Sequence, residues 1–544
     1  METGGFGGKI ADGNSWLATG FRILNARFNL SFAAMQAERP IKVLYLSYDG
    51  MTDPLGQSQV LGYLLPLSKR GEEVHLVSFE KPVAYASGKG EVLRTLRDYH
   101  NLHWHPLIYH KKPPVLSTLN DLRKGLRYVK QLAREQGPFD IVHCRGYLPP
   151  LFGGLWAQQD HGAKLIFDMR GWWPDEKRES GNWDSPLFLP IYRWFKRREK
   201  EFFRKADLNI SLTRAGAREI EHLTGIPEEE VLIIPTCVNF EYFPPFDPEV
   251  RSRVREELNI PEDAWVVVYS GSLGGNYPVG DILATYKAFL EEEPESYLYL
   301  LTLTPRETVQ AQLQEHGIDE RQVRYRAVPY TEVGPNLMAA DVGLIFYKQA
   351  YSVIGRSPTK LGEYWASGLP AIAPKGIGDV DNLLTRYAGG GWLLPDTEPA
   401  TLRTTARNAL QNRTDKDTLR AYATDYYSLE EGVNRYLSAH RRLAGRAFVP
   451  ALGRLGTEAE IRVLSVLEEF FPTGVRMPEL GYFLRSYLPP AKALAAETAV
   501  HDLLAEGHLH ITVERTPTPT GEVIELRKIV RQPAAEAEPA GLPA

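Results

Sequence analysis

Cysteine is scarce in this chain: only two occur among 544 residues, Cys144 and Cys237, and they form no CxxC pair. This scarcity argues against a disulfide scaffold and a cysteine-based zinc site, and it favours a reducing compartment. An excess of charge of one sign is also missing, because the formal net charge is -5. The near balance argues against a protein whose whole surface is built to bind nucleic acid.

Long apolar runs are missing too. No stretch approaches the roughly 18–20 continuous apolar residues that a membrane-spanning helix requires. The glycine-rich residues 1–39 carry no secretory signal pattern, so we expect a cytoplasmic protein. We interpret residues 1–39 as a disordered leader, or residues 1–34 as read-through upstream of a start at Met35.

A first domain is predicted over about 40–240, where strand patterns alternate with helical patterns. The apolar, β-branched run 41–49 is followed by a loop over 51–59 and by an amphipathic helix that ends at Gly71. Strand, glycine-containing loop, helix and strand form a βαβ unit. Further strands are predicted over 73–80, 139–145, 164–170, 207–213 and 231–235.

The same alternation restarts at 265–272 and predicts a second domain over 241–446. We therefore expect an α/β protein in which two Rossmann-like domains face a cleft at the carboxyl ends of their strands. An amphipathic helix over 428–445 closes the pair. The other predicted elements of this domain are strands at 296–304, 323–329, 341–347 and 369–374, and helices at 281–293 and 359–368.

Residues 456–532 differ in kind and predict a small α+β domain. Three short helical patterns precede a hairpin of alternating residues over 508–530, which is the outline of a winged helix. The third helix, about 489–507, sets Lys492 against several acidic residues, so a protein partner or self-association is favoured over DNA binding. The alanine- and proline-rich residues 533–544 are expected to be disordered.

Five segments near predicted strand ends are rich in glycine, charge and aromatic residues. They are DGMTDPLGQSQVLGYLLPLSKRG (49–71), FDMRGWWPDE (167–176), IIPTCVNFEYF (233–243), YSGSLGGNYP (269–278) and SPTKLGEYWASGLPAIA (357–373). In this order they resemble family-4 retaining glycosyltransferases of GT-B fold. The resemblance implies that a nucleotide-diphosphate sugar binds the second domain and a glycan or lipid-linked acceptor binds the first. It also implies retention of configuration, a role in polysaccharide biosynthesis, and no metal or other cofactor.

The start of the predicted helix 359–368 is the candidate donor site. Breaking a glycosyl–phosphate bond leaves negative charge on the departing diphosphate, so cations and helix-start amides aimed at it lower the barrier. Lys360 stands at this helix start, with Thr359 at the first helical position and Arg356 just before it. We interpret all three as donor-binding and Lys360 as catalytic. The alternative for Lys360 is a solvated surface lysine.

Glu363 lies one helical turn beyond Lys360, so both side chains point to the same side of the helix. The resemblance implies that Glu363 belongs to the catalytic site and accepts hydrogen bonds from the nucleotide ribose. An intrahelical ion pair with Lys360 is the alternative, and both can hold at once.

Two positions depart from the family pattern. The family often carries a glutamate that contacts the transferred sugar eight positions before Glu363, where this chain has Gly355. A common arginine after the first glycine of the second domain's opening turn, Gly271, is replaced by Ser272. Gly271 and Ser272 are still assigned to the donor site. Because the usual charge is missing, an inactive relative of these enzymes remains an alternative.

In the first domain, Gly56 lies in the predicted loop after the first strand, where the backbone can approach a donor phosphate or the acceptor. A turn glycine without a ligand is the alternative. His143 ends a predicted strand, where the family places a histidine that contacts the donor sugar. A purely structural histidine is the alternative there.

The segment FDMRGWWPDE concentrates charge at a strand end and is assigned to acceptor binding. Asp168 and Arg170 are interpreted as acceptor contacts or as a structural ion pair. Asp175 and Glu176 are candidates for the base that takes the acceptor proton, although in this class the departing phosphate can do so instead.

Two metal-like patterns are disfavoured. Asp379-Val380-Asp381 has DxD spacing but follows two glycines, so a helix start capped by an aspartate is favoured. A group of histidines without cysteines lies in a strand-like segment, which disfavours zinc binding. These histidines are His100, His103, His105 and His110.

Residues 186–205 mix aromatic and basic side chains. This pattern fits peripheral contact with an anionic membrane or, slightly favoured, an amphipathic domain helix with a solvated basic face. A different class of function is a non-catalytic sugar-nucleotide sensor, or a DNA-binding regulator that uses the winged-helix-like module.

Overall fold

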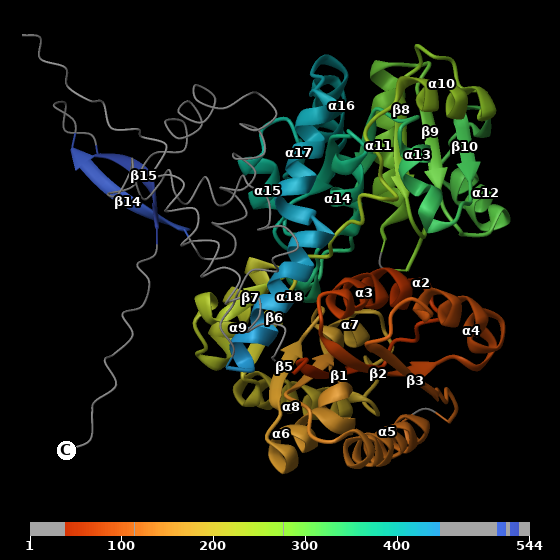
Figure 1. Ribbon diagram of the computed structural model, residues 1–544. Helices are drawn as coiled ribbons and strands as arrows, with labels where there is room; N and C mark the ends of the chain where they lie inside the picture. Colours follow the sequence, from red (N-terminus) through yellow and green to blue (C-terminus); the bar gives the residue numbers. More distant parts are fainter. Residues whose placement is uncertain (1–38, 114, 276, 446–508, 518–522, 532–544) are drawn as a thin grey trace, which may run out of the picture.

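The structure is a computed structural model that describes residues 39–113, 115–275, 277–445, 509–517 and 523–531. Two α/β domains follow one another along the chain, the first in red to yellow and the second in green to teal (Figure 1). Each domain is built around one parallel sheet, which confirms the predicted pair of Rossmann-like domains.

The first sheet has seven parallel strands in the order β3-β2-β1-β4-β5-β6-β7, so the strand order reverses beside β1. Its strands are β1 Lys42–Ser47, β2 Glu73–Glu80, β3 Leu102–Ile108, β4 Ile141–Arg145, β5 Lys164–Asp168, β6 Leu208–Ser211 and β7 Val231–Ile233. Its helices are α2 Pro54–Gly56, α3 Gly62–Lys69, α4 Pro82–Leu96, α5 Leu116–Gln136, α6 Leu155–His161, α7 Trp173–Glu179, α8 Leu189–Lys205 and α9 Arg214–Thr224.

The second sheet has six parallel strands in the order β10-β9-β8-β11-β12-β13. Its strands are β8 Val266–Ser270, β9 Tyr297–Leu301, β10 Val323–Arg326, β11 Val342–Leu344, β12 Ala371–Pro374 and β13 Gly391–Leu394. The helices of this half are α10 Pro248–Glu257, α11 Val279–Glu292, α12 Arg306–Glu315, α13 Val333–Leu337, α14 Thr359–Ala366, α15 Val380–Arg386, α16 Pro399–Gln411, α17 Lys416–Tyr427 and α18 Leu429–Leu443.

Successive residues of the central strands enter core layers on opposite faces of each sheet. In β1, Val43 and Tyr45 pack in one layer, while Leu44 and Leu46 pack in the other. The same alternation holds in β8. Burial on both faces explains why these strands are continuous apolar runs rather than alternating ones.

Helix α18 returns the chain from the second domain to the first. Helix α17 packs on α14 of the second domain, whereas α18 lies beside the strands of the first (Figure 1). Val433 and Leu437 of α18 join the first-domain core, and Tyr436 Oη donates a 2.7 Å hydrogen bond to Asp168 of β5. The predicted closing helix therefore packs as part of the first domain.

The predicted loop over 51–59 is wrong in its second half. The chain is helical from Pro54 through α2, a π-helical turn over Gln57–Leu61, and α3. Proline at a first helical position suits a helix start because its φ is already helical. Gly56 therefore lies in a helix, where an added Cβ would sit 2.0 Å from the carbonyl oxygen of Gly50. Close packing of this turn is a sufficient reason for the glycine.

The hairpin predicted over 508–530 is present as the antiparallel strands β14 Leu509–Pro517 and β15 Val523–Arg531. The predicted helices of the same module lie outside the described residues, as do residues 1–38 and 533–544. Within the described residues, no helix has both the length and the apolarity that crossing a bilayer demands.

Candidate functional site

Two cations and three tyrosine rings form a stack at the carboxyl edge of the second sheet, which we call the tyrosine–cation ladder. Lys360 Nζ lies 4.2 Å from the ring centroids of both Tyr269 and Tyr277. It also donates a 3.0 Å hydrogen bond to Tyr269 Oη. Tyr277 packs against Tyr347 with ring centroids 5.2 Å apart, and the Arg356 guanidinium lies 5.2 Å from the Tyr347 centroid. The ladder thus links two residues that the sequence assigned to the donor site.

A glycine turn after β8 lets the lysine reach the ladder. Gly271 has φ +122°, and a Cβ there would lie 3.0 Å from Lys360 Cε and 3.1 Å from its Nζ. The lysine side chain therefore crosses directly over the Gly271 turn. A side chain at this position would press on the lysine and would need a φ that L-residues rarely adopt. Ser272 is exposed, and its carbonyl oxygen accepts a 2.9 Å hydrogen bond from Tyr269 Oη.

The start of α14 faces the same region. Pro358 precedes the helix and no side chain caps it within the described chain, so the first helical residues Thr359 and Lys360 keep the positive end of the helix dipole uncompensated. The backbone of this helix start and the ammonium of Lys360 both carry positive charge.

Lys360 and Glu363 are both almost fully buried, and burial moves their pKa values toward each other. Burial lowers the pKa of Lys360 to about 7, an effect that the Glu363 charge opposes. Burial raises the pKa of Glu363 to about 7, against a hydrogen bond from Tyr330 and the charge of Lys360. No ion pair joins the two side chains within the described residues, so the proposed intrahelical pair is not observed. Paired shifts of this kind are typical of functional sites.

The loop before α14 also contacts the first domain. Arg356 pairs with Glu176 of α7 at 3.4 Å. Four residues earlier, the Ser352 amide donates a 3.0 Å hydrogen bond to Glu179 Oε1 of the same helix. Glu176, predicted on the acceptor side, is therefore held by Arg356, predicted on the donor side, and the two assignments meet at one interdomain contact.

Gly355 is packed against the first domain as well. A Cβ at this position would lie 2.6 Å from Cδ1 and 2.9 Å from Nε1 of Trp172. Trp172 is fully buried, and its Nε1 has no hydrogen-bond partner in the part of the chain that the structure describes. The position that carries a sugar-contacting glutamate in the resembled family is thus occupied here by an indole–backbone contact between domains.

Restoring that glutamate with Gly355→Glu is expected to lower the free energy of unfolding by about 1–3 kcal/mol, because the side chain must displace the Trp172 indole. Thermal and denaturant unfolding of the variant measure the effect. Gly90→Glu is the matched control, since Gly90 is exposed in α4 and has open space around its Cβ position. A Gly355→Glu protein as stable as the wild type would contradict this prediction and show that the Trp172 indole can move without a loss of stability.

The prediction that His143 ends its strand is wrong. His143 lies in the middle of β4 and is fully buried. Its Nδ1 is 3.2 Å from His440 Nε2 of α18, and its Nε2 is 3.4 Å from Asp168 Oδ2. Burial lowers the pKa of His143 to about 4, so the ring is neutral at pH 7. These contacts fit the structural alternative, in which His143 helps to join the first sheet to α18.

Arg145 is the residue that actually ends β4, and the sequence interpretation missed it. It is buried, and its Nε has no hydrogen-bond partner among the described residues, with Asp49 at 3.7 Å as an ion-pair partner. An incompletely paired cation at a carboxyl strand end is a better candidate for an anionic ligand than His143. Its position as the last residue of the predicted strand 139–145 was the available signal.

Asp168 and Arg170 lie close to His143, where the first sheet contacts α18. Asp168 Oδ1 is 3.8 Å from Arg170 Nη1, and Arg170 Nη2 donates a 3.2 Å hydrogen bond to Gln59 Oε1. Burial alone would raise the pKa of Asp168, but the Arg170 charge and the His143 hydrogen bond outweigh it and lower that pKa. The ion-pair interpretation therefore fits the geometry. Tyr436 of α18 was missed because only folding brings it to Asp168.

Asp175 lies in the wall of a cavity of about 530 Å³ to which both domains contribute, the second through Tyr351. Its carboxylate accepts hydrogen bonds from Tyr192 Oη and Lys196 Nζ, both at 2.8 Å. The cavity is lined mainly by charged and hydroxyl-bearing side chains. Of the four predicted acceptor residues, Asp175 lines this cavity.

The helix start predicted at 379–381 is confirmed, because α15 begins at Val380 directly after Asp379. The Asp379 side chain does not cap α15, however. It accepts hydrogen bonds of 2.7 and 3.0 Å from the amides of Arg214 and Ala215, which open α9 of the first domain. Asp379 is thus an interdomain helix cap, and its carboxylate is already committed.

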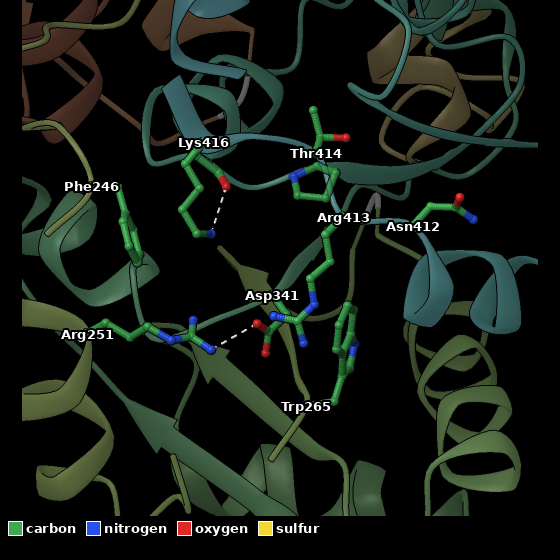
Figure 2. A pocket seen from close by; sticks show the side chains of 10 residues that line it. Phe246, Arg251, Trp265, Asp341, Asn412, Arg413, Thr414 and Lys416 are labelled. Atoms are coloured by element: carbon green, nitrogen blue, oxygen red, sulfur yellow. Dashed lines mark hydrogen bonds and ion pairs between the residues drawn. The ribbon is translucent and has the colours of Figure 1, made fainter. Parts of the chain in front are cut away.

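A second cavity, of about 230 Å³, lies at the opposite edge of the second sheet (Figure 2). Trp265 and Asp341, which line it, directly precede β8 and β11. Arg251 Nη2 donates a 2.9 Å hydrogen bond to Asp341, and Lys416 Nζ donates one of 3.1 Å to the carbonyl of Gly368. Because these are amino ends of strands, this cavity is separate from the ladder.

Two domains with parallel sheets, joined by a helix that returns from the second domain to the first, define the GT-B class of fold. Residues 56–242 match the family described as Glycosyltransferase Family 4. A D-inositol 3-phosphate glycosyltransferase of Nocardioides sp. is 23% identical over 332 residues, which cover 57% of this chain and 69% of that protein.

Solved structures agree on the fold. Sucrose-phosphate synthase from Thermosynechococcus elongatus has a TM-score of 0.58 at 16% identity, over 74% of this chain and 99% of that one. Anabaena HepE, solved with UDP and glucose, has a TM-score of 0.54 at 15% identity, over 73% of this chain and 99% of that one. The match to the family model thus lies in the first domain, and the solved structures agree with the two-domain fold.

Proposed function

We propose that this protein transfers a sugar from a nucleotide-diphosphate sugar to a glycan or lipid-linked acceptor, with retention of configuration. The observation that carries the proposal is the buried ammonium of Lys360 over the Gly271 turn, with Glu363 one turn further along α14. The HepE structures contain UDP, UDP-glucose, or UDP with glucose, which supports this class of donor.

In this proposal the diphosphate lies on Lys360, Arg356 and the first amides of α14. As the bond from C1 to the diphosphate breaks, negative charge grows on the leaving oxygen, and these fixed donors stabilise it. The diphosphate also raises the pKa of Lys360 and so keeps it charged. The acceptor approaches from the first domain near Asp175, and its proton passes to that carboxylate or to the departing phosphate. No metal ion is required.

The cellular setting proposed is polysaccharide biosynthesis on the cytoplasmic side, with α8 as the element nearest to a membrane. Phe202 and Phe203 of α8 are buried, which fits an amphipathic domain helix. On its other face Trp194 is 45% exposed beside Arg193 and Arg197, and this is where an anionic membrane surface would be contacted.

A thermal-shift screen against UDP-, GDP- and ADP-linked sugars tests the proposal, followed by assay of the best ligand for slow hydrolysis and transfer. Stabilisation by a nucleotide sugar together with release of the nucleoside diphosphate is the expected result. The competing candidate is a non-catalytic nucleotide-sugar-binding protein, which the Gly355–Trp172 contact favours. Stabilisation without hydrolysis or transfer would support that candidate instead.

Glu363→Gln is expected to weaken nucleotide-sugar binding about tenfold, because a charge-assisted hydrogen bond to the ribose becomes a neutral one. Isothermal titration with the best donor measures the change, and turnover at saturating donor should fall much less. Glu398→Gln is the control, since this exposed glutamate precedes α16 far along the chain from α14. Wild-type affinity in Glu363→Gln would remove this residue from the donor site.

A further inference from the structure

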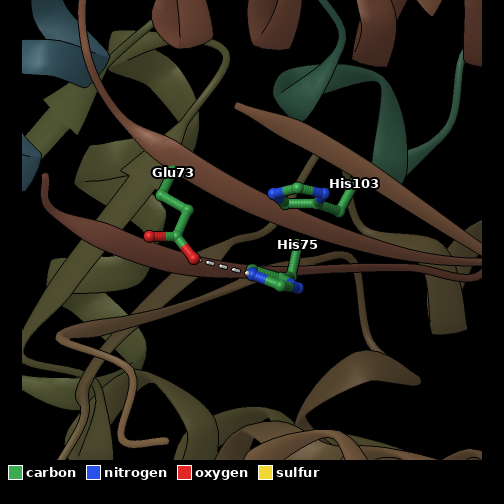
Figure 3. Close-up of side chains that lie close together, drawn as sticks. All are labelled: Glu73, His75 and His103. Atoms are coloured by element: carbon green, nitrogen blue, oxygen red, sulfur yellow. Dashed lines mark hydrogen bonds and ion pairs between the residues drawn. The ribbon is translucent and has the colours of Figure 1, made fainter. Parts of the chain in front are cut away.

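Three metal-ligating side chains meet on the first sheet, apart from the ladder. Glu73 and His75 of β2 and His103 of β3 offer ligand atoms that all lie within 4.8 Å of one another (Figure 3). His75 and His103 are register partners in the parallel sheet, and Glu73 stands two residues before His75. All three side chains therefore project from the same face.

We propose that Glu73, His75 and His103 bind a divalent transition-metal ion, for which Zn²⁺ is the probe. Two imidazoles and one carboxylate are a donor set that suits zinc and its neighbours in the transition series, and three protein ligands leave one position for water. Ligand atoms around a tetrahedral zinc are about 3.4 Å apart. Glu73 Oε1 and His75 Nε2 already stand 3.2 Å apart.

The buried ligand is held in place by a second layer of contacts. His75 Nδ1 lies 3.2 Å from His105 Nε2, and His105 Nδ1 lies 2.9 Å from Tyr128 Oη of α5. Metal-binding histidines commonly have their second ring nitrogen fixed in this way. The contact leaves His75 Nε2 facing Glu73 Oε1.

The third ligand is free to complete the site. His103 is exposed and makes no hydrogen bond or ion pair among the described residues, so its side chain can rotate toward the other two ligand atoms. Lys42 Nζ lies 3.1 Å from Glu73 Oε1 and competes for that carboxylate. The ammonium also donates a 2.7 Å hydrogen bond to the carbonyl of Gln136, and this contact remains when a metal takes Glu73.

The proposal revises the interpretation of the histidine-rich segment. The sequence interpretation considered four histidines of one segment as zinc ligands. The proposed site contains one of them, His103, together with Glu73 and His75 of the neighbouring strand β2. Strand β3 is the edge of the seven-stranded sheet. A metal bound here would fasten this edge strand to β2 and protect it against fraying.

Zinc binding by the full-length chain, prepared without a histidine tag and freed of metal with a chelator, tests the proposal. Competition with a chromophoric chelator should reveal a Zn²⁺ site of micromolar or tighter Kd in the wild type. His103→Ala and Glu73→Gln should each lose this Zn²⁺ site or weaken its affinity for Zn²⁺ at least tenfold. Saturating Zn²⁺ should raise the Tm of the wild type by about 3 °C and leave the Tm of His103→Ala unchanged.

His100→Ala is the matched control, because His100 is exposed and only three residues from His103. It should bind Zn²⁺ like the wild type. Co²⁺ should give the intense visible absorption of a four-coordinate ion in the wild type and lose it in Glu73→Gln. A wild-type chain without this site, or the same affinity in His103→Ala and Glu73→Gln as in the wild type, would overturn the proposal.

Discussion

Replacing Lys360 with alanine is expected to lower turnover about a hundredfold, on the order of one lost charge-assisted contact to the transition state. The Lys360 ammonium is a buried cation at the Gly271 turn, whereas the other cation of the ladder, Arg356, lies against Tyr347. Donor binding should weaken much less than turnover, because the charge matters most when the diphosphate departs. Initial-rate kinetics with the best donor at saturation measure this ratio.

Lys375→Ala is the control, since Lys375 is exposed just beyond the carboxyl end of β12, on the same edge of the sheet. The pH dependence gives an independent check. Glu363 must lose its proton and Lys360 must keep its proton, and both pKa values lie at about 7. The kcat/KM for the nucleotide sugar should therefore peak near pH 7 and fall on both sides. Lys360→Met should abolish the alkaline fall and move the acid fall to higher pH, because the Lys360 charge lowers the pKa of Glu363. Unchanged kinetics in Lys360→Ala would remove the residue from the mechanism.

Replacing Asp168 with asparagine is expected to lower the free energy of unfolding by about 3 kcal/mol, because it leaves the Arg170 guanidinium buried without its carboxylate. The same change weakens the hydrogen bond from Tyr436 that attaches α18 to β5. Denaturant unfolding monitored by tryptophan fluorescence measures the loss. The pKa of Asp168 is lowered in the folded protein, so its contribution is present above the unfolded pKa and disappears as the pH falls.

The difference between wild type and Asp168→Asn should accordingly shrink in acid, and this separates a charge effect from a packing effect. Glu292→Gln is the control, because Glu292 forms a solvent-exposed pair with Arg407 whose loss should not change stability measurably. An Asp168→Asn protein with full stability but no transfer would contradict the structural role and place Asp168 with the acceptor.

The two sheets were predictable because buried parallel strands are continuous apolar runs, and such runs are visible locally. The loop over 51–59 was not, because a helix that starts at Pro54 and packs Gly56 on Gly50 has few apolar residues in its first turn. Helix α14 was predicted correctly with Lys360 at its start. What surrounds the lysine, the rings of Tyr269 and Tyr277, follows from distant strand and loop positions.

The sequence by itself determined the succession of βαβ units, and it placed Lys360 and Glu363 on one face of a helix, because strand burial and helical periodicity are local properties. Only the tertiary structure decided which of the polar and charged side chains are held by partners from distant parts of the chain. The sequence suggested ligand contacts for His143 and Asp168 and a cap of its own helix for Asp379. Helices α18 and α9 instead bring distant partners to these side chains. Partner choice depends on chain segments that are far apart in sequence, so no local pattern encodes it.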